Sequence, residues 1–277
     1  MSVLKPVTGK RPKLIGTDLD GTIVAHYGFI SERTKIAFTA AHEAGIHIYF
    51  VTGRPIRWMS EIKENFNFGT GICANGAMLY DFINQKVLEQ WLFSVENQLE
   101  TVKRLREVIP LVNFAVEIDE QFHREKDYLA RWDIGIDNVG VNKIEEVINK
   151  PALKMLARCG DASMSSDEMM SAATKALVGI ATVTHSNSTD SLLEISADGV
   201  SKGETLSKIA ARHGLTAEDC VTFGDNPNDF SMLQWAGRSY AMIDGHHAGP
   251  ANAKDVAPPH NQDGVAIVIE RLLELPK

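Results

Sequence analysis

The stretch Leu14-Ile15-Gly16-Thr17-Asp18-Leu19-Asp20-Gly21-Thr22 decides the fold. It begins as a short apolar run, typical of a buried strand, and ends in a polar turn. Asp18 and Asp20 are separated by one residue, so in an extended chain their side chains point the same way. Two carboxylates this close repel each other unless a cation or a shared proton lies between them. A hard divalent cation with oxygen ligands fits such a pair, magnesium above all.

The two carboxylates of this motif are also candidates for a nucleophile and a general acid/base. The alternative explanation is an acidic turn whose carboxylates are merely solvated. By chance, the pattern D-x-D-G-T is expected only about 0.002 times in a chain of this length and ordinary composition. It also follows an apolar strand directly, which favours the functional interpretation.

Working outward from this stretch, short apolar segments alternate with segments of helical spacing. The predicted strands of this pattern are 14–19, 46–51, 71–74, 191–195, 220–223 and 239–243, and the predicted helices include 31–44, 56–66, 202–213 and 264–273. Such alternation indicates βαβ units and a parallel sheet. The middle of the chain has helices and short mixed strands instead. The sequence therefore predicts an α/β fold: a discontinuous Rossmann-like core (1–82 and 188–277) with an inserted α+β cap domain (83–187).

Three further polar groups follow predicted strands or open a predicted helix. They are Thr52-Gly53-Arg54, Lys202 before Gly203, and the cluster Gly224-Asp225-Asn226-Pro227-Asn228-Asp229. In an open parallel sheet, ligands bind beyond the carboxyl ends of the strands, so these groups are expected to converge on one pocket. Taken singly, each has an ordinary explanation. Thr52 fits a simple turn, Lys202 a surface position, and Pro227 the first turn of a capped helix.

Two of these groups also suit an anion. Thr52 and Gly53 can hold a phosphoryl oxygen with a hydroxyl and a backbone N–H. A lysine at the start of a helix is unfavourable for the helix dipole, which suggests another task for Lys202, such as neutralising a phosphoryl group.

Composition and charge narrow the possible partners. Hydrophobic residues make up 44% of the 277 residues and charged residues 23%, as in ordinary globular proteins. The formal net charge of −8 disfavours nucleic-acid binding, so an anionic substrate needs a local positive device. Three separated cysteines suggest neither a disulfide framework nor a zinc site. No apolar run approaches the ~18 residues of a membrane helix and no signal peptide is recognisable, so we expect a cytoplasmic protein without membrane partners.

The four motifs, in order, resemble those of the haloacid dehalogenase (HAD) superfamily. They are Asp18-Leu-Asp20-Gly-Thr22, Thr52-Gly-Arg54, Lys202-Gly203 and Gly224-Asp225-x-x-Asn228-Asp229. The large insert between the second and third motifs, with Asn75-Gly76 leading into it, resembles that of the Cof-type (class IIB) phosphatases. The insert matches this class in position and size rather than by a motif.

The resemblance implies a role for each motif residue. Asp18 is the nucleophile, and Asp20 is the acid that protonates the leaving group and then activates water. The phosphoryl group is bound by Thr52, Gly53, Lys202 and Asn228. Magnesium is held by the Asp18 side chain, the Asp20 backbone carbonyl and Asp225. Asp229 supports the metal site and Lys202 without binding the metal directly. Arg54 and Asn75 are candidates for contact with the substrate.

The function expected from this set is a Mg²⁺-dependent phosphatase of small phosphorylated metabolites, either sugar phosphates or phosphorylated cofactors. Two alternatives remain open: a phosphomutase or phosphoryl transferase, and a non-catalytic phosphometabolite sensor. The presence of both Asp18 and Asp20 argues against the sensor. A monomer and a homodimer are both compatible with the sequence.

Overall fold

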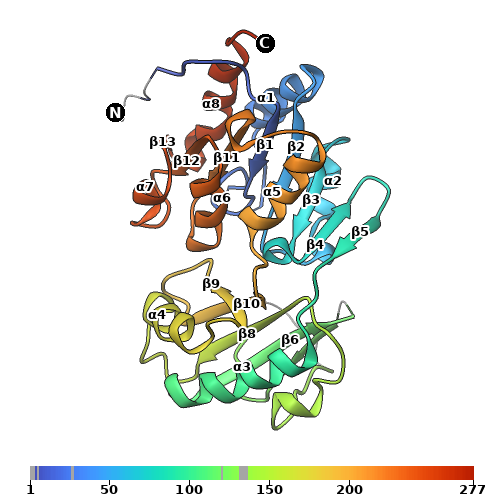
Figure 1. Cartoon of the computed structure of the whole chain (residues 1–277), viewed down its shortest axis with the longest axis vertical. Helices are drawn as coiled ribbons and strands as arrows, with labels where there is room; N and C mark the ends of the chain where they lie inside the picture. Colours follow the sequence, from blue (N-terminus) through green and yellow to red (C-terminus); the bar gives the residue numbers. More distant parts are fainter. Residues whose placement is uncertain (1–3, 5, 26–27, 120, 131–136) are drawn as a thin grey trace. The chain divides into compact units, whose positions relative to one another are not determined.

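The structure is a computed structural model that describes residues 4, 6–25, 28–119, 121–130 and 137–277. The chain divides into two compact units, one made of Met1–Glu89 with Ser201–Lys277 and the other of Gln90–Val200 (Figure 1). The first unit is therefore discontinuous in sequence and the second is continuous. None of the helices in the described ranges is long and apolar enough to cross a membrane.

An eight-stranded sheet forms the centre of the first unit. In spatial order its strands are β13 (Asp255–Ala257), β12 (Arg238–Met242), β11 (Cys220–Gly224), β1 (Leu14–Thr17), β2 (His47–Val51), β3 (Thr70–Cys73), β4 (Met78–Asp81) and β5 (Lys86–Gln90). The pairs from β13 to β3 are parallel, and β4 runs antiparallel to β3. Strands β1 and β11 are buried along their whole length, as central strands covered on both faces are.

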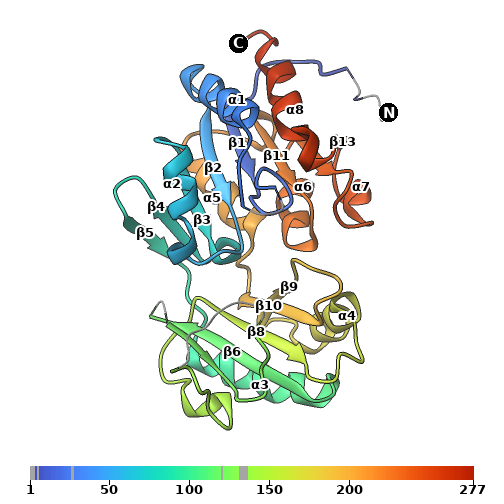
Figure 2. The same ribbon diagram turned by 180° about the vertical axis from the view of Figure 1, so that it is seen from behind.

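Helices cover both faces of this sheet. They are α1 (Glu32–Glu43), α2 (Ser60–Asn65), α5 (Lys202–Arg212), α6 (Phe230–Trp235), α7 (Gly249–Asn252) and α8 (Gly264–Leu273), with short 3₁₀ turns at Ile56–Trp58, Ala74–Gly76, Ala217–Asp219, Pro227–Asp229 and His260–Gln262. Helix α1 packs against α8 on one face, and α5 packs against α6 on the other (Figures 1 and 2). Helix α1 connects β1 to β2 and α6 connects β11 to β12 in the opposite direction along the sheet, so right-handed crossovers place these two helices on opposite faces.

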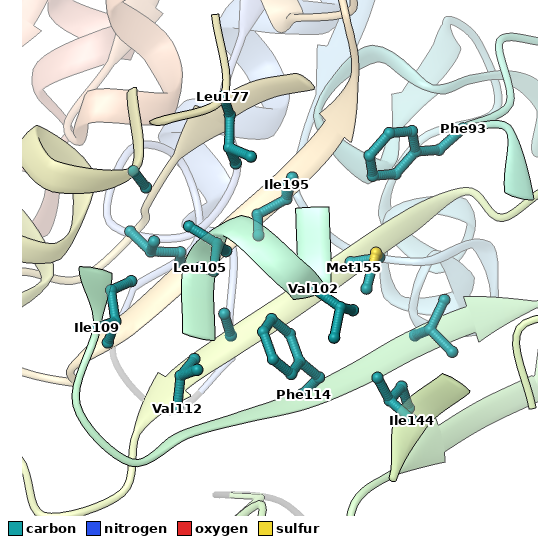
Figure 3. Close-up of a cluster of buried hydrophobic side chains, with 14 of the residues drawn as sticks. Phe93, Val102, Leu105, Ile109, Val112, Phe114, Ile144, Met155, Leu177 and Ile195 are labelled. Atoms are coloured by element: carbon teal, nitrogen blue, oxygen red, sulfur yellow. The ribbon is translucent and has the colours of Figure 1, made fainter. Parts of the chain in front are cut away.

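The second unit is a five-stranded antiparallel sheet with helices on one face. The strand order is β7 (Gln121–Arg124), β6 (Val112–Ile118), β8 (Lys154–Cys159), β10 (Leu192–Ala197) and β9 (Ala181–Thr184). Helices α3 (Val95–Val108) and α4 (Ser166–Ala176) complete it, with a 3₁₀ turn at Ile144–Glu146. Its core joins α3 residues such as Leu105 to strand residues such as Phe114 and Ile195 (Figure 3). The predicted α/β fold class with an additional α+β insert is confirmed.

The sequence assigned two strands to a different sheet from the one in which the structure places them. The expected boundaries of 83 and 187 put β5 in the insert and β10 in the core. In the structure β5 extends the eight-stranded sheet and β10 lies between β8 and β9. The alternation in β10 is compatible with this place, because Leu193 and Ile195 enter the helix-covered core while Glu194 lies on the opposite face. Part of the ambiguous segment 128–149 lies outside the described residues.

Candidate active site

Three neighbouring strands bring the polar motifs of the first unit to one edge of its sheet. Asp18 follows β1, Thr52 follows β2 and Asp225 follows β11, and these strands are adjacent and parallel. The backbone N–H of Asp18 donates to Phe223 O at 2.9 Å, and that of Thr52 donates to Ile72 O at 2.8 Å, so both residues continue the ladders of their strands. The three side chains therefore come from backbone that the central sheet holds in place.

Lys202 lies at the start of α5 and reaches the end of β1. Its side chain is fully buried, and its Nζ donates to Asp18 Oδ1 and to Asp229 Oδ1, both at 2.6 Å. Ser201 caps the helix by accepting the N–H of Glu204 through its hydroxyl, so the first turn of α5 has a fixed start. Burial lowers the pKa of Lys202, but Asp18 and Asp229 outweigh it, so the pKa is raised and the lysine stays charged.

The Asp229 carboxylate accepts hydrogen bonds from the backbone of the loop that follows β11. Its Oδ1 accepts from Lys202, and its Oδ2 accepts the backbone N–H of Asp225 at 2.9 Å and of Asn226 at 3.0 Å. Its side chain is completely buried. The same carboxylate thus fixes both the position of Lys202 and the conformation of the Asp225 loop.

Three carboxylates crowd around the single ammonium group of Lys202. One oxygen from each of Asp18, Asp225 and Asp229 lies within 4.8 Å of the other two. Burial and the nearby Asp229 raise the pKa of Asp18 to about 7, although Lys202 lowers it. Burial, then Asp18 and Asp229, raise the pKa of Asp225 well above its ordinary value, although Lys202 lowers it. These shifts mean that, without a bound cation, the state in which all three carboxylates are ionised is disfavoured.

The donor set of this cluster fits a divalent cation. Three carboxylates against one ammonium leave two excess negative charges when all are ionised, which one divalent ion would neutralise. Asn228 gives a second indication, because its Oδ1 is buried and accepts no hydrogen bond from the described residues, while its Nδ2 donates to Asn75 Oδ1 at 3.1 Å. An orphaned acceptor oxygen suits a cation or a water molecule bound to one.

The Asp20 carboxylate is not part of this cluster. Its carboxylate pairs with the guanidinium of Arg54, Nε to Oδ2 at 2.7 Å and Nη2 to Oδ1 at 2.5 Å, and its side chain is 60% exposed. The Asp20 carboxylate is thus bound by Arg54 and is not one of the three clustered carboxylates, although it lies near enough to raise the pKa of Asp18. Asp20 and Arg54 form a pair at the solvent side of the site.

The second motif and Asn75 lie close to these groups. Thr52 is buried, and its Oγ1 accepts the backbone N–H of Arg54 at 3.0 Å, which closes a tight turn through Gly53. Asn75 contacts Asn228 as described above, and its own φ is +55°. The structure thus gathers all the predicted site residues in one unit, but it separates Asp20 and Arg54 from the buried acidic cluster.

Two contact residues were missed by the sequence argument. Asn226 donates from Nδ2 to Asp225 Oδ2 at 2.5 Å, and Glu61 accepts from Arg54 Nη1 at 2.8 Å. Asn226 lies inside the fourth motif, so its position was a usable signal. Glu61 lies on α2 outside any motif, and nothing in the sequence marks it.

The chain is similar to known proteins in both sequence and fold. A family model described as haloacid dehalogenase-like hydrolase matches residues 15–269. The 5-amino-6-(5-phospho-D-ribitylamino)uracil phosphatase YitU of Bacillus subtilis (strain 168) is 26% identical, with 96% of this chain and 99% of that protein covered. Pyridoxal phosphate phosphatase YbhA of Escherichia coli (strain K12) is also 26% identical, with 92% and 96% covered.

Among solved structures, that of the HAD subclass IIB sugar phosphatase BT4131 has a TM-score of 0.72 with this chain. The two are 22% identical, and the match covers 93% of this chain and 98% of that one. This likeness shows that both units of the fold are shared.

Proposed function

Because the chain belongs to the haloacid dehalogenase-like hydrolase family, we propose that it is a magnesium-dependent phosphatase that hydrolyses small phosphorylated metabolites through an aspartyl-phosphate on Asp18. The observation that carries this proposal is the fully buried Lys202, whose ammonium bridges Asp18 and Asp229 at 2.6 Å beside a third carboxylate. Such an arrangement fixes a nucleophile and a positive charge at the same point.

The reaction divides into two displacements at phosphorus. In the first, the Asp18 carboxylate bonds to phosphorus, the bond to the leaving oxygen breaks, and Asp20 gives that oxygen a proton. In the second, water loses a proton to Asp20 as it attacks phosphorus, and the bond to Asp18 breaks to release phosphate. Lys202 offsets the negative charge of the transferring group in both steps, since its Nζ lies beside Asp18 Oδ1.

Thr52 and Gly53 suit a phosphoryl oxygen in the same site. The Thr52 hydroxyl uses an oxygen lone pair to accept the Arg54 N–H, so its own proton remains to be donated. The adjacent turn supplies the Gly53 N–H as a second donor. We assign these two residues, with Lys202, to the binding of the transferring group.

The residues that would hold magnesium are Asp18 and Asp225 through their carboxylates and Asp20 through its backbone carbonyl. When bound, the ion would supply positive charge that offsets the carboxylates and the transferring phosphoryl group. Asp229 supports this site without being a ligand, because both of its oxygens already accept from Lys202 and from backbone N–H groups. Asn228 lies beside it with its unused acceptor oxygen.

The motif residues recognise a phosphoryl group but contain little that could distinguish one alcohol from another. We therefore assign leaving-group specificity to the second unit, Gln90–Val200, and propose it as a cap that excludes water during turnover. Two relatives, named as a phosphatase of a ribitylaminouracil phosphate and as one of pyridoxal phosphate, support phosphorylated sugars and phosphorylated cofactors as the first substrates to try.

The test is a phosphate-release screen over a panel of phosphorylated metabolites with magnesium and without a second hydroxyl acceptor. We expect turnover of at least one monoester, its loss in EDTA and its recovery with magnesium. Calcium is larger and takes more ligands, so it should bind and inhibit. Undiminished activity after exhaustive chelation would contradict the metal role. Transfer to an added hydroxyl acceptor without phosphate release would indicate a phosphoryl transferase instead.

A further inference from the structure

The guanidinium of Arg54 is held between two carboxylates from different parts of the first unit. Asp20 takes Nε and Nη2 at 2.7 and 2.5 Å, and Glu61 on α2 takes Nη1 at 2.8 Å. Arg54 has thereby used donors on all three of its nitrogens within the unit.

The two carboxylates differ in their exposure to water. The Arg54 side chain is only 13% exposed and that of Glu61 24%, whereas that of Asp20 is 60% exposed. A shielded cation is costly to leave without a counter-charge. Glu61 therefore lies on the protected side of Arg54, and Asp20 lies on the side from which a carboxylate can move.

Proton transfer requires that Asp20 be released from this pair. Both of its oxygens are engaged by Arg54, so at least one of them must leave before the carboxyl group can reach a leaving oxygen. If Asp20 were the sole counter-charge, its departure would strand the shielded guanidinium. Glu61 removes that obstacle, because it neutralises Arg54 whether or not Asp20 is present.

We propose that Glu61 is a positioning residue that acts through Arg54, keeping the guanidinium neutralised so that Asp20 can exchange between Arg54 and the reacting atoms. This inference rests on the proposed function, since Asp20 has protons to transfer only in that reaction. It predicts that Glu61 matters most for substrates whose leaving group needs a proton.

The experiment compares Glu61→Gln with the wild type on two esters, an alkyl phosphate taken from the screen and p-nitrophenyl phosphate. An alkoxide leaves only with a proton, whereas p-nitrophenolate leaves without one. We expect kcat/KM for the alkyl ester to fall about tenfold and that for the nitrophenyl ester to change less than about twofold, a selectivity typical of lost acid catalysis. Glu64→Gln, an exposed glutamate on the same helix, is the matched control and should change neither value.

Two further variants separate positioning from a general structural effect. In an Arg54→Gln background, Glu61→Gln should cause no further loss on the alkyl ester, because the residue through which Glu61 acts is gone. Glu61→Asp keeps the charge and should retain most of the wild-type ratio between the two esters. Thermal unfolding midpoints of all variants check that each one is folded.

Three results would overturn the proposal: equal losses on both esters, the same loss from Glu61→Gln with and without Arg54, or wild-type kinetics of Glu61→Gln on the alkyl ester. A wild-type protein that releases phosphate from neither ester would instead refute the proposed function, and the role of Glu61 with it. The two failures are therefore distinguishable in one set of measurements.

Discussion

Asp18 has two partners with opposite effects on its charge. Lys202 favours the ionised form from 2.6 Å, while burial and the neighbouring Asp229 disfavour it more strongly. A nucleophile must be ionised to attack phosphorus, so the cluster needs an additional positive charge during turnover. With Asp18 as the nucleophile that we propose, its reaction would therefore depend on a cation bound at this cluster.

Replacing Asp18 by Asn tests its role as the nucleophile. The amide has nearly the same shape but cannot attack phosphorus, so kcat should fall by at least about a thousandfold. The fold should persist, because the Asn oxygen can still accept from Lys202 and one of three mutually repelling carboxylates is removed. Steady-state phosphate release and thermal unfolding measure the two effects, with the exposed Asp198→Asn as control. A variant with more than about a tenth of the wild-type kcat would show that Asp18 is not the nucleophile.

The raised pKa of Asp18 predicts a pH dependence of stability in the metal-free protein. The folded state holds the proton more tightly than the unfolded chain, with a pKa of about 7 against an ordinary value of 3.8. The stabilisation is therefore complete below about pH 4 and is lost as the pH rises through 7. In EDTA, the free energy of unfolding of the wild type, taken relative to Asp18→Asn, should decrease between pH 5 and pH 8.

Urea unfolding at both pH values measures this difference, and the comparison with Asp18→Asn cancels the contributions of titrating groups that do not interact with Asp18. Magnesium binds the ionised carboxylates, so it should stabilise the wild type more at pH 8 than at pH 5. A wild-type advantage in EDTA that grows toward pH 8 would contradict the burial of Asp18 in an overcharged cluster.

Among the elements, helix α5 links packing to chemistry. Gly203, directly after Lys202, lies against α6 so closely that an added Cβ would be 2.4 Å from the backbone C and O of Ser231. Its N–H donates to Ser231 Oγ at 3.0 Å, which fixes the same contact. The absence of a side chain at 203 thus allows α5 to sit where Lys202 can reach β1.

Gly203→Ala should therefore push α5 away from α6. We expect a loss of about 1–3 kcal/mol in the free energy of unfolding, as overpacking usually causes, together with reduced kcat from a displaced Lys202. Lys208→Ala on the exposed side of the same helix should change stability by less than about 0.5 kcal/mol. Urea unfolding and phosphate release measure both variants. An unchanged Gly203→Ala would show that the two helices can separate without cost.

The elements also show why some features could be predicted from the sequence and others could not. Ser201 and Gly214 bracket α5 with a cap and a turn of positive φ, so its limits were predicted to within a residue. The motif residues could be found because each follows a predicted strand or opens a predicted helix, and the family resemblance that they carried is confirmed. The assignment of fold class needed only this alternation of strands and helices.

The structure differs from the sequence prediction where strand pairing and long-range contacts, rather than the local sequence pattern, determine the arrangement. Strand β10 has an apolar pattern that fits either sheet, and only its antiparallel pairing with β8 and β9 assigns it to the second unit. The turn that sends Asp20 toward Arg54 depends on a contact between two loops 34 residues apart. Glu61 joins that contact from α2, and a long-range ion pair leaves no periodic signal in one sequence.

For the molecule as a whole, the division into two units predicts a division of labour. Replacing 90–200 by a short Gly/Ser linker keeps every motif residue and removes the unit that we assign to specificity. A folded truncation should still hydrolyse p-nitrophenyl phosphate but should lose discrimination among metabolites. The quantity to compare is the ratio of kcat/KM values across the panel before and after truncation. An unchanged ranking of substrates in a folded, active truncation would place specificity in the first unit.

The discontinuity of the first unit also constrains how the chain acquires its structure during synthesis. Strand β1 pairs with β11, with Leu14 opposite Cys220. The central sheet therefore cannot be completed until β11 has been translated. The second unit is continuous and is released from the ribosome earlier, so it can fold while the first remains open. Limited proteolysis of ribosome-stalled chains should find 90–200 protected at lengths where Asp18 and its neighbours are still cleaved. Asp18 is translated 184 residues before Lys202, so the buried cluster that contains both can form only after the second unit has been synthesised.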